Sequence, residues 1–243
     1  EAVVQGGPSA GSPVVFESAT SNYISATYDS TNGKVVIAYQ DNGNSSYGTA
    51  VVGTVSGTSI SFGTPVVYSS ALITSMSATY DLTNSKVVIS YRNNGNSGFG
   101  TAIVGTVSGT SISFGTAALF DNSSSIDISA TFDSNSNKVV VAYRDFGNSD
   151  IGMTVVGTVS GTSISFGTPA TINNAVSDSF SATFDSTNNK VVVAYRNYGN
   201  SSFGTARVGT VSGTSISFGT AVVFESANSA YMSATFDSSS SKV

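Results

Sequence analysis

Three residue types that carry much of protein chemistry are missing from this sequence: it contains no cysteine, no histidine and no tryptophan. The absence of cysteine excludes disulfide bonds and a thiolate nucleophile, and leaves the redox compartment undefined. Without histidine the chain also lacks the commonest general base and the commonest metal ligand. These absences weigh against an enzyme that works through a cysteine or a histidine.

Charge is also scarce. Charged residues make up 9% of the chain and the formal net charge is -5. A nucleic-acid-binding protein needs a basic stripe, so nucleic acid is not an expected partner. No apolar stretch approaches the roughly 18 residues of a membrane-spanning helix. The first residues show none of the basic and apolar regions of a signal peptide, so any targeting segment has been removed or never existed.

Internal repetition is what the sequence has in abundance. The segment Ser-Ala-Thr-(Tyr/Phe)-Asp recurs every 52 residues, starting at Ser25, Ser77, Ser129, Ser181 and Ser233. The string GTVSGTSISFGT is identical in its four occurrences, which start at Gly53, Gly105, Gly157 and Gly209. A fixed period of this length indicates a repeat architecture built from one supersecondary unit per repeat.

Each repeat divides into four stretches with strand character. In the first copy they are Tyr23–Asp29, Lys34–Gln40, Thr49–Val55 and Ile60–Tyr68. Turns rich in Ser, Asn and Gly separate them. The second stretch is apolar at consecutive positions such as Val35 and Val36, which point to opposite sides of a strand. A strand of this kind is covered on both faces.

These units predict one domain over the whole chain. Its parts are a closing outer strand in residues 1–22, full repeats at 23–74, 75–126, 127–178 and 179–230, and a partial repeat at 231–243.

Proline indicates the strand order within a unit. Pro13, Pro65 and Pro169 occupy one repeat position in the fourth stretch. Because proline cannot donate a ladder hydrogen bond, the fourth strand is expected at an edge. A four-stranded unit that is buried on both faces is typical of a propeller blade. The sequence therefore predicts an all-β fold, a five-bladed β-propeller of four-stranded antiparallel blades, with a linear solenoid as the alternative.

The two ends of the chain suggest how the ring closes. Pro13-Val14-Val15-Phe16 match the fourth stretch of a repeat, and Lys242-Val243 match the start of a second one. We expect the N-terminal strand to pair with the C-terminal partial repeat. The piece that corresponds to Val192 through Val208 is absent, and a chain seldom ends inside a strand, so we expect the protein to continue beyond Val243. If this chain alone does not close the ring, the open second-strand position would pair with another copy.

The repeat resembles those of propeller lectins and sialidase-type propellers, and those of phage tail-fibre and bacterial adhesin proteins. Sialidase-type blades carry the motif Ser-x-Asp-x-Gly-x-Thr-Trp on the turn between the third and fourth strands. Here that turn runs from Ser56 to Gly63 and has neither the Asp nor the Trp. The resemblance implies the fold and recognition of glycans or cell surfaces, and it transfers no functional residue.

Two sets of charges follow the repeat. One set pairs an aspartate with a lysine around a four-residue turn: Asp29, Asp81, Asp133, Asp185 and Asp237, with Lys34, Lys86, Lys138, Lys190 and Lys242. The two residues can face each other across the strand pair, and the carboxylate can also accept hydrogen bonds from turn amides. An exposed pair contributes about 0–1 kcal/mol, so we interpret this set as structural.

The second set predicts a repeated ligand site. An arginine or glutamine ends the second strand, a Gly-Asn-Ser loop follows, and an aromatic residue comes next. The candidate residues are Gln40, Asn44, Tyr47, Arg92, Asn96, Phe99, Arg144, Asn148, Arg196, Asn200 and Phe203. Guanidinium, amide and aromatic groups together suit carboxylates, sulfates and sugar rings. In the alternative interpretation the arginines bind loop carbonyls and the aromatics fill space between blades.

Neither a metal nor catalysis is predicted. The loops Asp41–Asn44 and Asp145–Asp150 offer oxygen ligands, but their order does not match a calcium loop and the other copies begin with asparagine. The carboxylate pair of a glycosidase cannot be assigned to particular residues. The sequence thus predicts a non-catalytic, multivalent binding module without cofactor, extracellular or on a virion surface, that recognises glycans or other cell-surface molecules. A purely structural fibre repeat and a glycoside-active enzyme are the alternatives.

Overall fold

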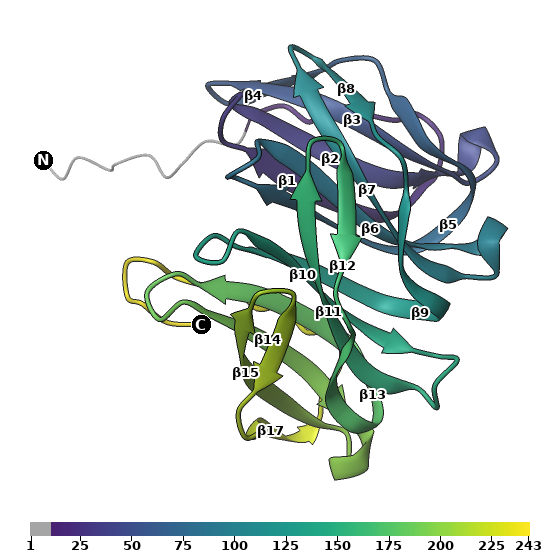
Figure 1. Cartoon of the computed structure of the whole chain (residues 1–243). Coiled ribbons are helices and arrows are strands. Elements are labelled where there is room, and N and C mark those ends of the chain that lie inside the picture. The colour runs from purple at the N-terminus through teal and green to yellow at the C-terminus, as the bar shows by residue number, and fades with distance from the viewer. Residues whose placement is uncertain (1–10) are drawn as a thin grey trace, which may run out of the picture.

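The structure is a computed structural model that describes residues 11–243. Across that range the chain forms seventeen antiparallel strands and three single 3-10 turns (Figure 1). Each repeat forms an antiparallel sheet, and long strands shared between neighbouring sheets link them in chain order. This confirms the predicted all-β class. No helix within residues 11–243 is long and apolar enough to cross a membrane.

The strands recur in the same order in every repeat, and the third repeat lacks the 3-10 turn that the others have after the second strand. The first has β1 (Ser21–Asp29), β2 (Lys34–Asp41), η1 (Asn42–Asn44), β3 (Tyr47–Ser56), β4 (Ser59–Phe62) and β5 (Val66–Asp81). The second has β6 (Lys86–Asn93), η2 (Asn94–Asn96), β7 (Phe99–Ser108), β8 (Ser111–Phe114) and β9 (Ala118–Asp133). The third has β10 (Lys138–Asp145), β11 (Ile151–Ser160), β12 (Ser163–Phe166) and β13 (Ala170–Asp185). The fourth has β14 (Lys190–Asn197), η3 (Tyr198–Asn200), β15 (Phe203–Ser212), β16 (Ser215–Phe218) and β17 (Val222–Asn228).

The fourth strand of each sheet is split, where the sequence predicted one continuous stretch. In the first repeat β4 and the start of β5 both pair with β3, through Gly53 with Phe62 and Ala50 with Val66. Pro65 lies in the irregular break between them. Proline has no N–H to give to a ladder, and the break is a place where none is needed.

The long strands β5, β9 and β13 each serve two sheets. Their first half is the outer strand of one sheet, and their second half is the first strand of the next. Between the halves the backbone bends at Ser75, Asp127 and Ser179, which have positive φ angles of 44, 52 and 55. Positive φ is uncommon in residues other than glycine. These bends fall on the first residue of each predicted repeat.

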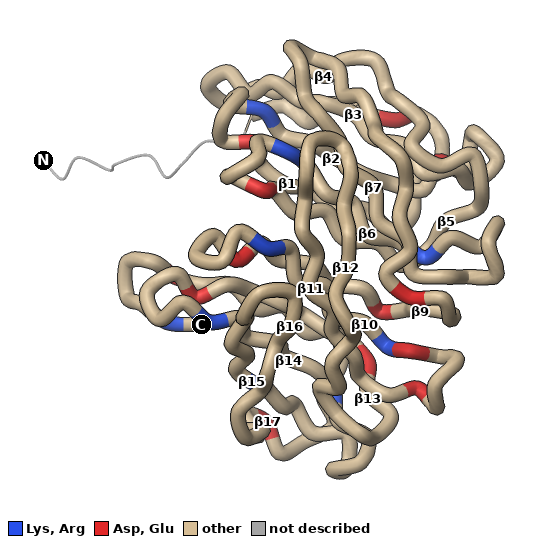
Figure 2. Tube along the Cα trace, in the orientation of Figure 1, with Lys and Arg blue, Asp and Glu red and all other residues tan. Residues whose placement is uncertain are grey.

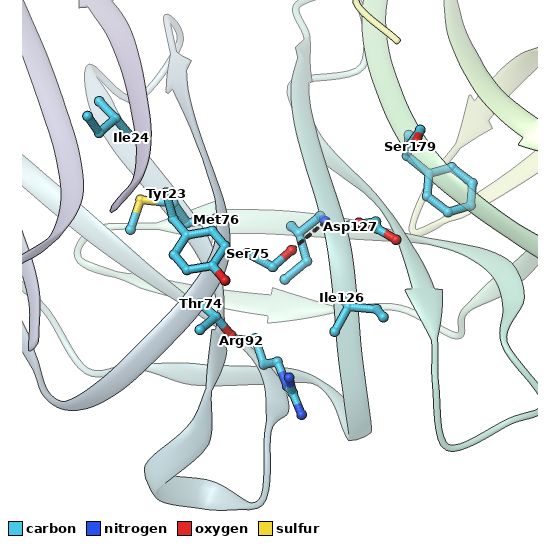
Figure 3. Close-up of a pocket in the computed structure, with 11 residues that line it drawn as sticks. Tyr23, Ile24, Thr74, Ser75, Met76, Arg92, Ile126, Asp127 and Ser179 are labelled. Atoms are coloured by element: carbon cyan, nitrogen blue, oxygen red, sulfur yellow. Dashed lines mark hydrogen bonds between the residues drawn. The ribbon is translucent and has the colours of Figure 1, made fainter. Parts of the chain in front are cut away.

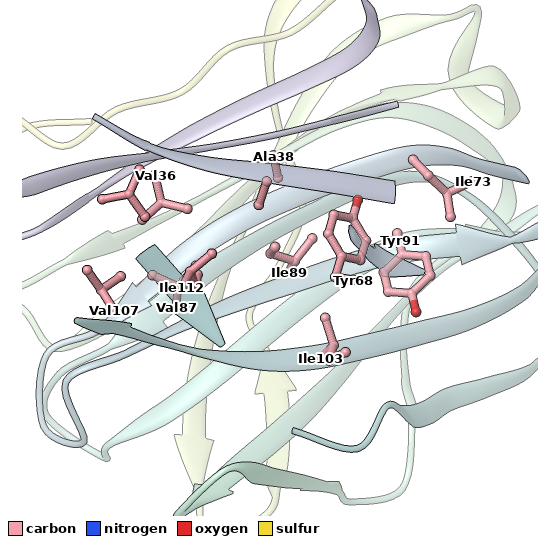
Figure 4. Close-up of a cluster of buried hydrophobic side chains, with 12 residues drawn as sticks. Val36, Ala38, Tyr68, Ile73, Val87, Ile89, Tyr91, Ile103, Val107 and Ile112 are labelled. Atoms are coloured by element: carbon pink, nitrogen blue, oxygen red, sulfur yellow. The ribbon is translucent and has the colours of Figure 1, made fainter. Parts of the chain in front are cut away.

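The hydrophobic core lies between neighbouring sheets and repeats along the chain. Figure 4 shows Val36 and Ala38 on β2 facing Ile89 and Tyr91 on β6, with Tyr68 from β5 completing the cluster. The Tyr68 and Tyr91 rings meet edge to face, with centroids 5.3 Å apart. Burial of each such aliphatic side chain stabilises the fold by about 1.5–3 kcal/mol. The predicted burial of the second strand on both faces is confirmed for β6 and β10, whereas Val35 and Ile37 of β2 are only partly buried.

The first strands of successive sheets lie side by side around one axis. The Ser25 Oγ accepts a hydrogen bond from the Ala78 N–H at 2.9 Å. The same contact joins Ser77 to Ala130, Ser129 to Ala182, and Ser181 to Ala234. Threonines of all five repeats line one cavity of about 440 Å³ at one end of the axis: Thr27, Thr79, Thr131, Thr183 and Thr235. Residues 231–237 therefore take the place of a fifth first strand.

The strand pairing that was predicted to close the ring is not present within residues 11–243. Residues 11–20 contain no strand, and residues 231–243 contain only the bridge between Asp237 and Lys242. The rest of the predicted closing strand, residues 1–10, lies outside the described range. The physical reason is that a fourth strand pairs with a third, and residues 231–243 include no third strand.

The Asp-Lys turn has the predicted register, and the predicted hydrogen bonds from turn amides to the aspartate are present. Asp29 lies opposite Lys34 on the paired strands. Its Oδ1 accepts hydrogen bonds from the Thr31 and Asn32 N–H groups at 3.0 Å. Burial alone would raise the pKa of Asp29, and hydrogen bonds from Asn32 and Thr31 bring it below its ordinary value. The Lys34 ammonium donates instead to the Thr54 hydroxyl at 2.8 Å, so this charge set is structural.

Candidate functional site

A cavity of about 400 Å³ opens at the end of the axis where the first strands begin (Figure 3). Its wall contains the bend residues of four repeats: Tyr23, Ser75, Asp127 and Ser179. All four have positive φ. Backbone strain of this kind often clusters at functional sites. The repetition of the bend thus builds one shared cavity at the axis.

The lining of this axial cavity combines apolar and polar groups. The apolar residues are Ile24, Met76, Ile126, Ile128 and Phe180, and the other polar residues are Thr74 and Arg92. The Ser75 hydroxyl accepts a hydrogen bond from the Ile128 N–H at 3.0 Å, which ties two neighbouring first strands together. Apolar surface with a few convergent polar groups is the usual character of a small-ligand site.

Arg92 is the unsatisfied cation of the cavity. It ends β6 opposite Thr74 on β5. Within residues 11–243 its Nε is buried without a hydrogen-bond partner, and Arg92 makes no ion pair. Gly98 lies beside it, where a Cβ would come within 2.6 Å of the Nε. A buried donor without an acceptor costs free energy, so this guanidinium is poised for an acceptor from a ligand.

Arg144, the equivalent residue of the third repeat, is paired within the protein. Its Nε donates to the Asp150 Oδ1 at 2.8 Å, and its Nη1 lies 3.9 Å from the Asp127 Oδ2. Burial raises the pKa of Asp127, nearby Asp178 raises it further, and Arg144 and Arg196 oppose both effects. Figure 2 shows these charges gathered near β9, β10 and β13.

Arg196 of the fourth repeat is held more tightly. Its Nε donates to the Asp178 Oδ1 at 2.7 Å, and its Nη2 donates to the second carboxylate oxygen. The Tyr198 hydroxyl also donates to Asp178, at 3.0 Å, and the Tyr198 ring centroid lies 4.6 Å from the Arg196 guanidinium carbon. Burial alone would raise the pKa of Asp178, and the bonds from Arg196 and Tyr198 bring it below its ordinary value.

The difference between these arginines follows from a few diverged positions. Thr74 faces Arg92 in the place where Asp178 faces Arg196, and Gly98 stands where the third repeat has Asp150. Ser75 likewise stands where the third repeat has Asp127. Arg92 therefore has none of the carboxylates that pair the other two arginines.

The first repeat has no cation at this position. Gln40 is buried, its Nε2 donates to the Ile73 carbonyl of the next sheet, and its Oε1 accepts from the Asn22 side chain at 3.2 Å. Gln40 thus links two neighbouring sheets through hydrogen bonds.

The remaining predicted residues lie on the loops between the second and third strands, at the same end of the molecule as the axial cavity. The asparagines are exposed there: Asn44, Asn96, Asn148 and Asn200. The aromatics are half-buried at the start of the third strands: Tyr47, Phe99 and Phe203. None of these lines the axial cavity, whereas Arg92 does.

Sequence reasoning missed the bend residues. The first residue of the five repeats reads Tyr23, Ser75, Asp127, Ser179 and Tyr231, and its immediate neighbours vary too, whereas the Ser-Ala-Thr segment that follows is identical in all five. This local variation within near-identical copies was the available signal. Within the described part of the chain, no three His, Cys, Asp or Glu residues are grouped so that they could hold a metal ion.

Weak likenesses to this chain exist among solved structures. A solved structure of the SapL1 lectin in complex with alpha-methyl fucoside matches with a TM-score of 0.47 and 14% sequence identity. The match covers 82% of this chain and 64% of that chain, so the chain spans less than two thirds of that protein. No family model and no curated protein sequence matches the chain.

Proposed function

We propose that this chain is a five-bladed β-propeller that binds an acidic carbohydrate at one end of its axis without catalysing a reaction. The five-bladed arrangement is supported by the five equivalent threonines around one cavity and by the serine contacts between successive first strands. In this arrangement each four-stranded sheet is a blade, and residues 231–237 begin the fifth.

One observation carries the binding proposal: the unpaired guanidinium of Arg92 in the axial cavity. A hydrogen bond to a charged group contributes about 1.5–3 kcal/mol. A planar guanidinium matches the oxygens of a carboxylate or a sulfate. The hydroxyls of Thr74 and Ser179 would bind sugar hydroxyls, and the ring of Tyr23, a residue that is 50% exposed, offers an apolar surface for a sugar ring. A uronic, sialic or sulfated sugar combines the anionic group, the hydroxyls and the apolar ring face that these residues would bind.

We propose one strong site at Arg92, surrounded by weaker contacts from the loops, in place of a site in every repeat. Arg144 and Arg196 already have carboxylate partners, so a ligand would have to displace these. The exposed loop asparagines surround the same end of the molecule. We propose that they supply weaker contacts to a longer glycan, which adds avidity on a surface that displays many copies. We propose no catalytic role for the carboxylates nearest Arg92, because Asp127 and Asp178 are tied to arginines.

The test is binding to an array of neutral, sialylated, uronic and sulfated glycans. The wild type is compared with Arg92→Gln, which copies the first repeat, and with Arg144→Gln, the same change at the equivalent position of the third repeat. We expect retention on acidic glycans that Arg92→Gln loses and Arg144→Gln keeps. Equal retention by both variants, or retention on neutral glycans only, would refute the Arg92 site.

A structural role in an extracellular or virion fibre is the second candidate. Its specific support is that Gln40, Arg144 and Arg196 make contacts inside the protein. This candidate predicts no retention on any glycan. Both candidates place the protein outside the cell or on a virion, which labelling of intact cells or particles with an antibody would test.

A further inference from the structure

The end of the axis opposite Arg92 holds a second cavity, and its lining has a different chemistry. We call it the threonine cavity, after Thr27, Thr79, Thr131, Thr183 and Thr235. Its volume of about 440 Å³ lies in the range of small-ligand sites, about 300–1,000 Å³. Hydroxyls and aromatic rings line it, and within residues 11–243 no charged side chain does. The cavity around Arg92 has both an arginine and an aspartate in its wall.

A threonine of one repeat faces an aromatic residue of the next across each gap between first strands. Ser25 bonds to the Ala78 N–H of the neighbouring strand, and Thr27, two residues further on, points to the same side. From across this gap the Tyr80 hydroxyl donates to the Thr31 hydroxyl at 2.7 Å. The gap therefore brings Thr27 and Tyr80 together. The same register gives the pairs Thr79 with Phe132, Thr131 with Phe184, and Thr183 with Phe236.

The threonine hydroxyls are available to a ligand. Four of the serines two positions before them hold neighbouring strands together, whereas within residues 11–243 none of the five threonine hydroxyls makes a hydrogen bond. Thr79 is only 9% exposed, and its accessible surface faces the threonine cavity. A hydroxyl so enclosed usually has a partner. A ligand hydroxyl that enters the cavity would supply it.

The surroundings of the threonine cavity favour a neutral ligand over an anion. The buried carboxylates of Asp29, Asp81 and Asp133 directly follow the aromatic residues and accept hydrogen bonds from the N–H groups of their own turns. The nearest repeated cation is turned elsewhere, since Lys34 donates to the Thr54 hydroxyl. A carboxylate or sulfate at this end would therefore meet like charges and no cation.

Hydrogen bonds between neighbouring turns brace this end of the axis. The Thr31 and Ser85 hydroxyls lie 3.1 Å apart, and so do the Thr187 and Ser241 hydroxyls. Each of these bonds joins two successive repeats. A site that is fixed before the ligand arrives spends less binding free energy on ordering its own groups.

We infer that the threonine cavity binds a neutral, hydroxyl-rich molecule of the size of a mono- or disaccharide. Each threonine hydroxyl can both donate and accept a hydrogen bond, as the hydroxyls of a sugar can. The aromatic residues between the threonines contribute apolar surface for the C–H groups of the ligand. A molecule on the axis leaves no room for a second, so one ligand binds per chain. This site is separate from the one at Arg92 and takes a ligand without charge.

Tryptophan fluorescence gives a direct test, because the chain has no tryptophan of its own. Leu82 lines the threonine cavity and is 54% exposed, so Leu82→Trp places a reporter at the cavity in a position where the fold tolerates it. Leu119→Trp is the matched control, since Leu119 is 46% exposed and lies outside the cavity.

The probes are glucose, galactose, mannose, N-acetylglucosamine, lactose and maltose. We expect a saturable fluorescence change in Leu82→Trp with at least one of these sugars and none in Leu119→Trp. No saturable change with any of them, or an equal change in both variants, would overturn the inference.

A pair of threonine variants then locates the ligand. In the Leu82→Trp background, Thr79→Val with Thr131→Val removes two hydroxyls at nearly constant volume and is expected to weaken binding by about tenfold. Thr106→Val with Thr158→Val is the control, because these hydroxyls are also buried without a partner but lie outside the cavity. Thermal unfolding verifies that both pairs fold. Equal weakening in the two pairs would refute the site.

Arg92→Gln, made in the same background, separates this inference from the function proposed above. We expect it to lose the acidic glycan and to keep the response to the neutral sugar. A neutral-sugar response that Arg92→Gln abolishes would place that sugar in the other cavity and refute the threonine site. A response that depends on Thr79 and Thr131, in a chain that binds no acidic glycan, would refute the Arg92 site alone.

Discussion

Arg92 and Arg196 occupy the same place in two nearly identical repeats, yet one is unpaired and the other is held by a bidentate carboxylate. The backbone around them is the same, because both end a second strand and face the first strand of their own sheet. The difference lies in the residue opposite, which is Thr74 for one and Asp178 for the other. Repeats that share a fold can therefore differ in how they use one position: here one arginine is left without a partner and another is held by a carboxylate.

The comparison also shows why a repeated motif is a poor guide to a repeated site. A guanidinium with a carboxylate partner satisfies its donors inside the protein, and a ligand gains little by replacing that partner. A ligand acceptor that reaches a buried donor without a partner gains the free energy of the new hydrogen bond. The residues that decide between the two states lie outside the motif.

Thr74→Asp is expected to have the largest effect, because it gives Arg92 the partner that Arg196 has. Pairing should satisfy the guanidinium and place a negative charge in the axial cavity. We expect the affinity for an acidic glycan to fall by about 10- to 100-fold, which corresponds to a loss of ~1.5–3 kcal/mol. Titration by fluorescence or calorimetry measures it. Thr74→Asn, of similar size but neutral, is the control, and an equal loss there would contradict the explanation by charge.

The reverse change, Asp178→Thr, is expected to lower the free energy of unfolding by about 1–3 kcal/mol. The Asp178 side chain is only 10% exposed and the Arg196 side chain 18%, so the arginine would lose its acceptor away from bulk water. Urea unfolding measures the effect. Asp150→Ser removes the partner of Arg144 and serves as a comparison. An unchanged stability in Asp178→Thr would show that the pair is energetically neutral.

The Arg196 pair should also show in the pH dependence of stability. The pKa of Asp178 lies below its ordinary value of 3.8, so ionisation of this group stabilises the folded state. That contribution is present above about pH 4 and is lost as the pH falls through the lower, folded-state pKa. We expect the stability difference between wild type and Asp178→Asn to shrink over this acid range. A difference that stays constant down to complete unfolding would refute the linkage.

Tyr198→Phe is expected to have the smallest effect. It removes the hydroxyl that donates to Asp178 and keeps the ring beside Arg196. One lost hydrogen bond lowers the free energy of unfolding by about 0.5–1.5 kcal/mol. Thermal unfolding of Tyr198→Phe beside Tyr198→Ala separates the hydroxyl from the ring. If the two variants are equally stable, the ring contributes nothing.

Much of the fold could be predicted from the sequence, because period, turn residues and apolar alternation are local signals. These predicted the four strands of each repeat and the burial of the second strand. The split of the fourth strand at Pro65 was missed. A proline is compatible both with an edge strand and with an irregular break between two strands, and the sequence alone does not distinguish the two. The predicted closing pairing failed because it required a third strand in residues 231–243.

The candidate site was predicted in part. Arg92 was identified from its repeat position, and of the four residues at that position it is the one that lines the axial cavity. Its distinction from Arg144 and Arg196 depends on which side chain faces it across a strand pair, which a linear motif does not reveal. The bend residues were missed because glycine is the usual sequence marker of positive φ, and residues such as Ser75 are not glycines.

The central claim is that the chain holds one acidic-sugar site, built on Arg92. Calorimetric titration of the wild type with a sulfated or uronic disaccharide tests it most directly, because it yields both affinity and stoichiometry. The account predicts one site per chain, and its loss in Arg92→Gln with the fold intact. Three equivalent sites per chain, or binding that Arg92→Gln leaves unchanged, would contradict it.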